Sequence, residues 1–442
     1  MAETLSKQHV AVIGGGIAGL AAAAELTRLN IKVTLFEASQ YLGGRARGLD
    51  YKGVWLDNGQ HILLGAYHET LRLLTLANVK ESDVLLRLPL QLTMQNLSNK
   101  STFILKACTA LPAPLHVLAG FFFASGLNAA EKFAAIRLMF WMKLQRFKIQ
   151  QDIPLFEFLT ARKQPESLTV KLWEPLCIAA LNTPIKLAST QIFLNVLRDS
   201  FNGKKTDSDL LLPKVDLSEL LSKPLDAYIT TNGGEIKKNT TVQNIQQTSD
   251  CFIVETNTNT EHFSHVVIAV APHQLKSLKL NTESMAPYTK HFSYQPITTI
   301  YLQYPEHVRL HNTMTGITNA TSQWLFDRGT LCGQHGLIAV VISANGDHQS
   351  LTNTELTEKI IKEVQQLYPQ ISYPIWTKVI TEKRATFSCE SSLIKPVSNT
   401  LIENLYIVGD FISSENNAHD YPATIEGAVR SGVKCADFIV NS

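Results

Sequence analysis

The stretch that decides the fold is His9-Val-Ala-Val-Ile-Gly14-Gly-Gly-Ile-Ala-Gly19-Leu20. It begins with Val10–Ile13, a short apolar run of the kind that lies inside a parallel sheet. Gly14, Gly16 and Gly19 follow with the spacing G-x-G-x-x-G. In such a turn the first glycine permits a sharp bend, the second lets the backbone approach a pyrophosphate, and the third lets a helix pack on the strand. The stretch therefore predicts a strand, a dinucleotide-binding turn and a helix.

An acid after the second strand and an arginine after two glycines further support a bound nucleotide. The Ala- and Leu-rich residues 17–29 predict a helix that ends near Asn30, a residue suited to a left-handed cap. After it, Lys32-Val-Thr-Leu-Phe-Glu37 predicts a second strand ending in an acid about 20 residues downstream, the position that accepts a ribose hydroxyl. Arg45 then follows two glycines and can bring its guanidinium to a diphosphate. We therefore favour a nucleotide site over a Rossmann-like sheet without one.

Composition excludes several classes of protein. A chain of 442 residues is long enough for two domains, or for one large domain with insertions. Its formal net charge of +2, without arginine- or lysine-rich blocks, argues against a nucleic-acid partner. The six cysteines are scattered without a C-x-x-C pair, so we expect neither a metal site nor a disulfide framework. The polar N-terminus lacks a secretory signal, and we expect a cytoplasmic protein.

A polar turn follows the first nucleotide-binding elements. Asp57-Asn-Gly-Gln60-His61-Ile62 lies between a predicted strand and an apolar run. Such side chains are costly to bury unpaired, so they must face one another, solvent or a bound cofactor. A self-satisfied turn and direct contact with a cofactor both remain open at this point.

Residues 85–209 have a different character. Leu85–Met94 alternates as one strand, which Phe103–Lys106 can pair with. The apolar stretch 110–127 is interrupted by prolines, and its clean part falls well short of the ~20 residues of a spanning helix. Glu131–Lys148 predicts a basic amphipathic helix, which suits either the surface of an anionic bilayer or an ordinary helix covering a substrate domain. Arg198-Asp199 is either a buried, specific pair or a solvated one.

The alternation of patterns along the chain predicts two intertwined units. Residues 210–276 return to an α/β pattern, with antiparallel strands near 241–245 and 251–255. We therefore expect an α/β, two-domain fold with a Rossmann-like domain and a discontinuous, mixed α+β substrate domain. The Rossmann-like domain is assigned residues 1–84, 210–276 and 396–442, and the substrate domain residues 85–209 and 277–395.

The C-terminal part of the chain predicts a second contact with the same cofactor. A strand near 404–408 delivers Gly409-Asp410 at its carboxyl end, where ligands of open α/β sheets bind. Its acid can accept a hydrogen bond from a ribitol hydroxyl. A helix beginning after Pro422 can direct its amides at a flavin pyrimidine. One nucleotide turn alone could serve NAD, but sites at both ends of the chain imply a long dinucleotide, and hence FAD.

With these residues in view, the chain resembles the flavin amine oxidase and phytoene desaturase superfamily. The resemblance is carried by Gly14–Gly19, Phe36-Glu37, Gly43–Arg45 and Gly409-Asp410. Narrower motifs resemble the squalene-associated FAD-dependent desaturases, a family understood as hydroxysqualene dehydroxylases: residues 57–67, 176–183, 196–200, 382–387 and 422–432. The chain departs from that family at Phe411-Ile412, where a Trp-Thr-like pair is common.

The resemblance implies a set of FAD-binding residues at each end of the cofactor, and no metal. At the ADP half these are Gly14, Gly16, Ala18, Gly19, Glu37, Ala38, Gly44, Arg45 and Val242. At the flavin end they are Gly59, Gln60, His61, Ile62, Gly409, Asp410, Thr424, Ile425, Glu426 and Ala428.

The resemblance also implies the chemistry. Hydroxysqualene would lose its allylic hydroxyl as water and gain a hydride, which needs a proton donor; the candidates are His61, His419 and Asp420. A thirty-carbon substrate holds roughly 20 kcal/mol of apolar transfer energy at ~0.8 kcal/mol per carbon. It must therefore come from a bilayer or from the preceding squalene-pathway synthases. We expect peripheral contact with the inner face of the cytoplasmic membrane through residues 110–148. An oxidative desaturase, an amine oxidase and a flavin-free prenyl-lipid carrier are the alternatives.

Overall fold

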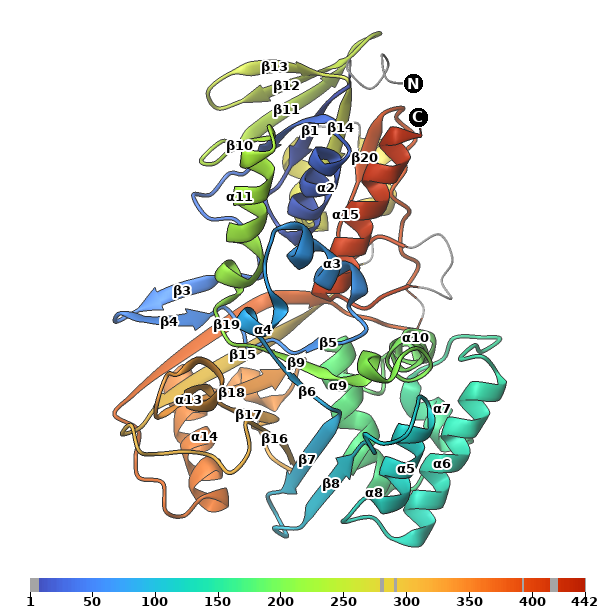
Figure 1. Cartoon of the computed structure of the whole chain (residues 1–442), viewed down its shortest axis with the longest axis vertical. Helices are drawn as coiled ribbons and strands as arrows, with labels where there is room; N and C mark the ends of the chain where they lie inside the picture. The colour runs from blue at the N-terminus through green and yellow to red at the C-terminus, as the bar shows by residue number, and fades with distance from the viewer. Residues whose placement is uncertain (1–7, 279–281, 290–291, 392, 414–419, 442) are drawn as a thin grey trace.

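A parallel sheet assembled from distant parts of the chain forms one half of the molecule (Figure 1). The computed structural model describes residues 8–278, 282–289, 292–391, 393–413 and 420–441. The strand order of the sheet is β10-β2-β1-β14-β20, and every neighbouring pair is parallel. The strands are β1 (His9–Ile13), β2 (Lys32–Phe36), β10 (Glu235–Lys237), β14 (His265–Ile268) and β20 (Leu405–Ile407).

Two helices from opposite ends of the chain pack closely on this sheet. Helix α2 (Ile17–Arg28) directly follows the glycine turn, and α15 (Ile425–Val440) lies beside it in Figure 1. Their backbones approach so closely that a Cβ at Gly432 would lie 2.3 Å from the Ala18 carbonyl oxygen. The predicted helix over 17–29 is thus present, and Asn30 has the left-handed φ of 59° expected of a cap. The neighbouring helices are α3 (His68–Leu76) and α11 (Lys223–Thr231).

An antiparallel sheet extends this half at the end of the molecule where β10 lies (Figure 1). It contains β11 (Val242–Gln247), β12 (Phe252–Thr256) and β13 (Thr260–Phe263), paired in chain order. This confirms the antiparallel strands predicted near 241–245 and 251–255. Val242, at the start of β11, is thereby brought to the end of β2.

A mixed sheet organises the other half. Its strand order is β19-β15-β18-β17-β16-β7-β8. One face is covered by α14 (Asn353–Leu367), which buries Ile360, Ile361 and Val364 against it. The strands are β7 (Gln91–Asn96), β8 (Thr102–Lys106), β15 (Tyr294–Gln303), β16 (Met314–Thr318), β17 (Trp324–Asp327), β18 (Leu337–Ser343) and β19 (Trp376–Phe387).

Helices gather beside this sheet (Figure 1). No helix within the described ranges has both the length and the apolar character needed to cross a membrane. These helices are α5 (Leu115–Phe123), α6 (Ala129–Leu144), α7 (Leu155–Ala161), α8 (Glu166–Leu168), α9 (Glu174–Leu181) and α10 (Thr190–Phe201).

Two sequence predictions about local structure are corrected here. The single strand predicted over Leu85–Met94 is broken at Pro89, which has no N–H for a ladder, and its halves join different sheets. The helix predicted over 131–148 ends at Leu144, because Arg146 and Phe147 adopt left-handed φ values of 52° and 58°.

The remaining elements are short strands and helices between those already described. They are β3 (Gly48–Tyr51), β4 (Val54–Asp57), β5 (Leu63–Leu64), β6 (Leu85–Leu88), β9 (Leu210–Pro213), α4 (Glu81–Val84), α12 (Thr282–Thr289), α13 (Arg328–Cys332), η1 (Thr169–Trp173), η2 (Lys205–Ser208), η3 (Ser218–Ser222), η4 (Pro272–Leu278) and η5 (Asp347–Ser350).

Candidate active site

A cavity of about 810 Å³ opens at the carboxyl ends of the parallel strands. It is lined by the residues that directly follow β1, β2, β14 and β20, which is where open α/β sheets bind their ligands. Its volume lies in the upper part of the ~300–1,000 Å³ range of small-molecule sites. The predicted site residues that line it are Gly14, Gly16, Ala18, Glu37, Ala38, Gly44, Arg45, His61, Val242, Gly409, Asp410, Thr424, Ile425 and Ala428.

The three motif glycines have distinct geometries. Gly14 has a φ of +111°, a conformation that side chains disfavour. A Cβ at Gly19 would lie 2.0 Å from the Gly14 carbonyl oxygen, so Gly19 serves the packing of α2 and does not line the cavity. A Cβ at Gly16 would have no protein atom within 4 Å. Gly16 is also the N-cap of α2 and offers no side-chain cap, so the uncapped helix amides face the cavity.

The Glu37 carboxylate is held in place by backbone donors. Its Oε2 accepts from the Gly15 amide at 2.7 Å, and its Oε1 accepts from the Ser39 amide at 2.8 Å. Each carboxylate oxygen has a second lone pair, so the fixed side chain can still accept from ribose hydroxyls. Ala38 and Val242 line the cavity beside it.

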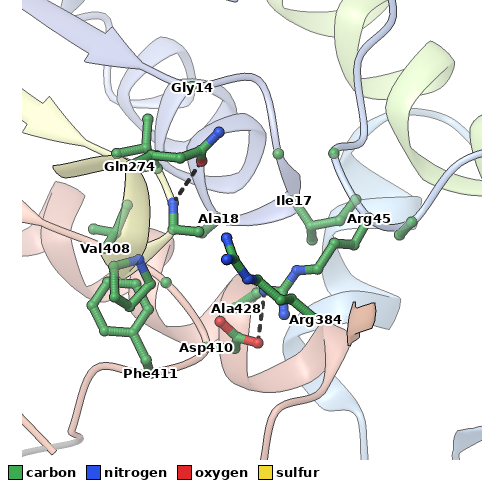
Figure 2. A pocket seen from close by; sticks show the side chains of 18 of the residues that line it. Gly14, Ile17, Ala18, Arg45, Gln274, Arg384, Val408, Asp410, Phe411 and Ala428 are labelled. Atoms are coloured by element: carbon green, nitrogen blue, oxygen red, sulfur yellow. Dashed lines mark hydrogen bonds and ion pairs between the residues drawn. The ribbon is translucent and has the colours of Figure 1, made fainter. Parts of the chain in front are cut away.

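Arg45 and Asp410 meet across the cavity (Figure 2). The Arg45 Nη2 lies 2.8 Å from the Asp410 Oδ2, and the Arg45 Nη1 donates to the Ala385 carbonyl at 2.8 Å. The Asp410 carboxylate raises the pKa of Arg45 and keeps it charged. The pair places a guanidinium and a carboxylate where an anionic diphosphate and the hydroxyls of a ribityl chain can engage them.

The polar turn after β4 divides its side chains between two environments. Asp57 and Gln60 turn into the protein, where the buried Arg328 guanidinium donates to Gln60 Oε1 at 2.7 Å and lies 3.3 Å from Asp57 Oδ2. His61 lines the cavity instead. The turn thus satisfies its own polar groups at Asp57 and Gln60, whereas contact of His61 with a cofactor stays a prediction. Gly59, Gln60 and Ile62 are not among the residues that line the cavity.

The protonation of His61 follows from its hydrogen bond. Its Nδ1 lies 2.6 Å from the Gly59 carbonyl oxygen, which can only accept, so Nδ1 carries a proton and the neutral ring has its lone pair at Nε2. Burial lowers the pKa of His61, and the Asp57 carboxylate opposes that shift. His61 is therefore mainly neutral at pH 7.

The start of α15 presents Thr424, Ile425 and Ala428 to the cavity but not Glu426. The Glu426 carboxylate is fully buried and accepts from the Thr70 amide at 2.9 Å and the Thr70 hydroxyl at 2.7 Å. It also pairs with Arg430 at 2.7 Å. Glu426 thus joins α15 to α3.

Asp420, the other predicted proton donor within the described residues, does not line the cavity. Asp420 is buried, and its Oδ1 accepts from the Ser413 hydroxyl at 2.8 Å. Its backbone carbonyl accepts from the side-chain amide of Asn195 at 3.0 Å. Asp420 is absent from the cavity lining. His419 lies outside the described residues.

Sequence reasoning missed several residues of the cavity wall. His273 and Gln274 follow β14, so the rule that ligands bind at the carboxyl ends of strands could have found them. Tyr294, Arg384 and Phe387 come from β15 and β19 of the mixed sheet, and only the chain's long-range topology brings them here.

The fold and site together define a class of protein: a dinucleotide-dependent oxidoreductase. The residues fit FAD, since uncapped amides, an open glycine and a fixed acid stand at one end and Asp410 with the start of α15 stands at the other. Residues 17–440 match the family of flavin-containing amine oxidoreductases, and the chain belongs to that family. The protein is a FAD-dependent oxidoreductase.

Two relatives and one solved structure are similar to this chain along nearly all of its length. A hydroxysqualene dehydroxylase of Zymomonas mobilis is 27% identical over 97% of this chain and 98% of its own. The 15-cis-phytoene desaturase of Arabidopsis thaliana is 24% identical over 98% of this chain and 80% of its own. Among solved structures, an oxidoreductase from Methanosarcina mazei has a TM-score of 0.74 at 15% identity, covering 98% of this chain and 100% of its own, which supports the fold.

Proposed function

We propose that this enzyme is a hydroxysqualene dehydroxylase, which reductively removes the allylic hydroxyl of hydroxysqualene to give squalene. The observation that carries the proposal is the end-to-end similarity to dehydroxylases: the alignment at 27% identity spans 97% of this chain and 98% of the Zymomonas mobilis protein. An oxidative isoprenoid desaturase is the second candidate, favoured by the relatives of that activity.

The proposed reaction replaces an allylic C–O bond of the substrate by a C–H bond. The allylic C–O bond breaks with its electron pair on oxygen, one proton converts the leaving hydroxide to water, and one hydride forms the new C–H bond. Reduced FAD, when bound, supplies the hydride. The protein's tasks are to orient the polyene, exclude water and deliver the proton.

His61 is our proposed proton donor. It lines the cavity from the turn after β4, and its Nε2 is the ring nitrogen left available by the bond from Nδ1 to Gly59. Because burial lowers the pKa of His61, the protonated ring is a minor form at pH 7 and a stronger acid than a solvent-exposed imidazolium.

We further propose that the enzyme takes its substrate from a membrane surface. Helices α5 and α6 expose apolar side chains beside basic ones, a combination suited to an anionic bilayer. Phe121 is buried, with 2% of its surface exposed, whereas Phe122 and Phe123 are 63% and 76% exposed. Phe133, Phe140 and Leu144 of α6 are exposed as well. We call these three residues, together with Phe122 and Phe123, the aromatic face.

Single-turnover product analysis tests the activity. The purified enzyme is loaded with FAD, reduced without oxygen, and mixed with hydroxysqualene in detergent micelles. We expect about one equivalent of squalene per enzyme-bound flavin, with reoxidation of the flavin absorbance. Oxidised enzyme is assayed in parallel with phytoene and a quinone, and with an amine and oxygen. Product in one of those assays, with no squalene in the first, would replace the proposal by a desaturase or an amine oxidase.

A further inference from the structure

A buried lysine lies directly behind the flavin end of the site. Lys395 is only 4% exposed, and its Nζ donates to the Asp410 carbonyl at 3.0 Å and to the Tyr421 carbonyl at 2.9 Å. Its Nζ also lies 5.1 Å from the centre of the Phe387 ring, which lines the cavity.

Lys395 joins the two chain segments that carry the flavin-end residues. Asp410 ends the connection from β20, whereas Tyr421 precedes Thr424, the N-cap of α15. One side chain thus sets the distance between the acid expected at the ribityl chain and the amides expected at the pyrimidine. Among the described residues, the hydrogen bonds of this buried ammonium go to two carbonyls, which is a costly environment for a charge, so a structural reason alone is a poor account of a lysine at this position.

Lys395 lines a second, smaller cavity and not the large one. A second cavity of about 240 Å³ is lined by Lys395, Tyr421 and Asp410, and Asp410 lines the large cavity as well. Asp410 is therefore part of the wall between the two cavities, with Lys395 on its far side. Burial lowers the pKa of the Lys395 ammonium, and the carboxylates of Asp420 and Asp410 oppose that shift and favour the charged form.

We propose that Lys395 is a positioning residue for the cofactor: it fixes Asp410 and the start of α15, and it places a buried positive charge behind the flavin end, where that charge stabilises the negatively charged reduced FAD. The proposal rests on the family's cofactor and not on the dehydroxylase activity. Its test uses no isoprenoid substrate, so failure of one proposal is distinguishable from failure of the other.

The test compares midpoint potentials of FAD-loaded variants, measured by equilibration with a redox dye. Lys395→Met removes the charge and both donors. We expect its affinity for reduced FAD to fall about tenfold more than its affinity for oxidised FAD, which lowers the midpoint potential by about 30 mV for a two-electron couple. Lys395→Arg keeps the charge and should retain a potential close to wild type.

Ser398→Ala is the matched control. Ser398 is buried, lines the same second cavity and donates to the Ile407 carbonyl at 2.9 Å, so the variant removes a neighbouring buried hydrogen bond without removing a charge. Its FAD potential should equal that of the wild type. If Lys395→Met does not fold, Lys395→Gln keeps N–H donors without the charge and should show the same lowered potential. A wild-type potential in a FAD-loaded Met or Gln variant would overturn the proposal, as would an equal fall in Lys395→Arg.

Discussion

At the scale of single residues, neighbouring glycines of one motif have separable tasks. Gly19 faces the Gly14 carbonyl and has no room for a side chain, whereas Gly16 faces open space in the cavity. Gly16 also has an extended backbone, with φ −71° and ψ 175°, which any residue can adopt. We therefore infer that glycine is required for folding at Gly19 and for cofactor binding at Gly16.

This difference predicts opposite outcomes for two valine substitutions. Gly16→Val should leave the thermal unfolding of the apoprotein unchanged and weaken FAD binding more than tenfold, because the new side chain fills space that the phosphates need. Gly19→Val should destabilise the apoprotein by about 1–3 kcal/mol or more through overpacking. Thermal unfolding without FAD and flavin fluorescence titration measure the two effects. Unchanged FAD affinity in Gly16→Val would contradict the assignment of the cavity.

His61 gives a prediction with a defined pH dependence. If its protonated ring delivers the proton, the single-turnover rate should rise as the pH falls through the His61 pKa, which burial places below 6.5. His61→Gln should lower the rate ~10²-fold or more, as removal of a general acid does, and should abolish that pH dependence. The variant must retain stoichiometric FAD for the comparison. An unchanged rate and pH profile in the FAD-loaded variant would remove His61 from the mechanism.

At the scale of elements, the aromatic face of α5 and α6 carries the membrane proposal. Phe122→Glu with Phe123→Glu should reduce partitioning onto phosphatidylglycerol vesicles about 100-fold, because two inserted phenylalanines contribute at least ~1.5 kcal/mol each. Vesicle co-sedimentation measures the change. Ile375→Glu with Leu401→Glu is the control, since both residues are exposed but lie outside this face. Equal partitioning of the aromatic-face variant and the wild type would exclude docking through α5.

The sequence predicted elements better than it predicted their partners. The strand–turn–helix around Gly14 and the strand that precedes Gly409 were found because local spacing alone specifies them. The break at Pro89 was missed, since an alternating pattern continues through it while the two halves join different sheets. Lys395 and the contact of Asp57 with Arg328 were missed because they depend on residues 15 to 271 positions apart, which no local pattern records.

At the scale of the whole molecule, the two halves are joined by specific polar contacts. The Tyr421 hydroxyl donates to the Asp199 Oδ2 at 2.5 Å, and the Arg430 guanidinium lies 4.1 Å from the centre of the Tyr421 ring. Arg198 pairs with the other oxygen of Asp199 at 2.8 Å. The Arg198-Asp199 pair is thus a specific, partly buried connection between α10 and α15, which settles the alternatives that the sequence left open.

Buried and partly buried histidines in both halves predict how stability depends on pH. Burial lowers the pKa values of His9, His116, His265 and His348. Below about pH 6.5 the unfolded chain therefore binds more protons than the folded chain, and the free energy of unfolding falls as the pH falls. Urea unfolding at pH 7.5 and pH 5.5 should show this loss. His116→Gln should show a smaller loss than the wild type, and an equal loss would contradict the assignment of His116.

The order of strands in the parallel sheet has a consequence for how the enzyme acquires its coenzyme. The turn at Gly14 leaves the ribosome early in synthesis, whereas β20, Asp410 and the start of α15 emerge several hundred residues later. A growing polypeptide can therefore hold at most the adenosine end of FAD, and flavin loading must wait until translation has passed Ala428. Nascent chains stalled on a C-terminal extension long enough to expose α15 should accordingly be retained on a FAD-affinity resin, whereas chains stalled before β20 should not be retained.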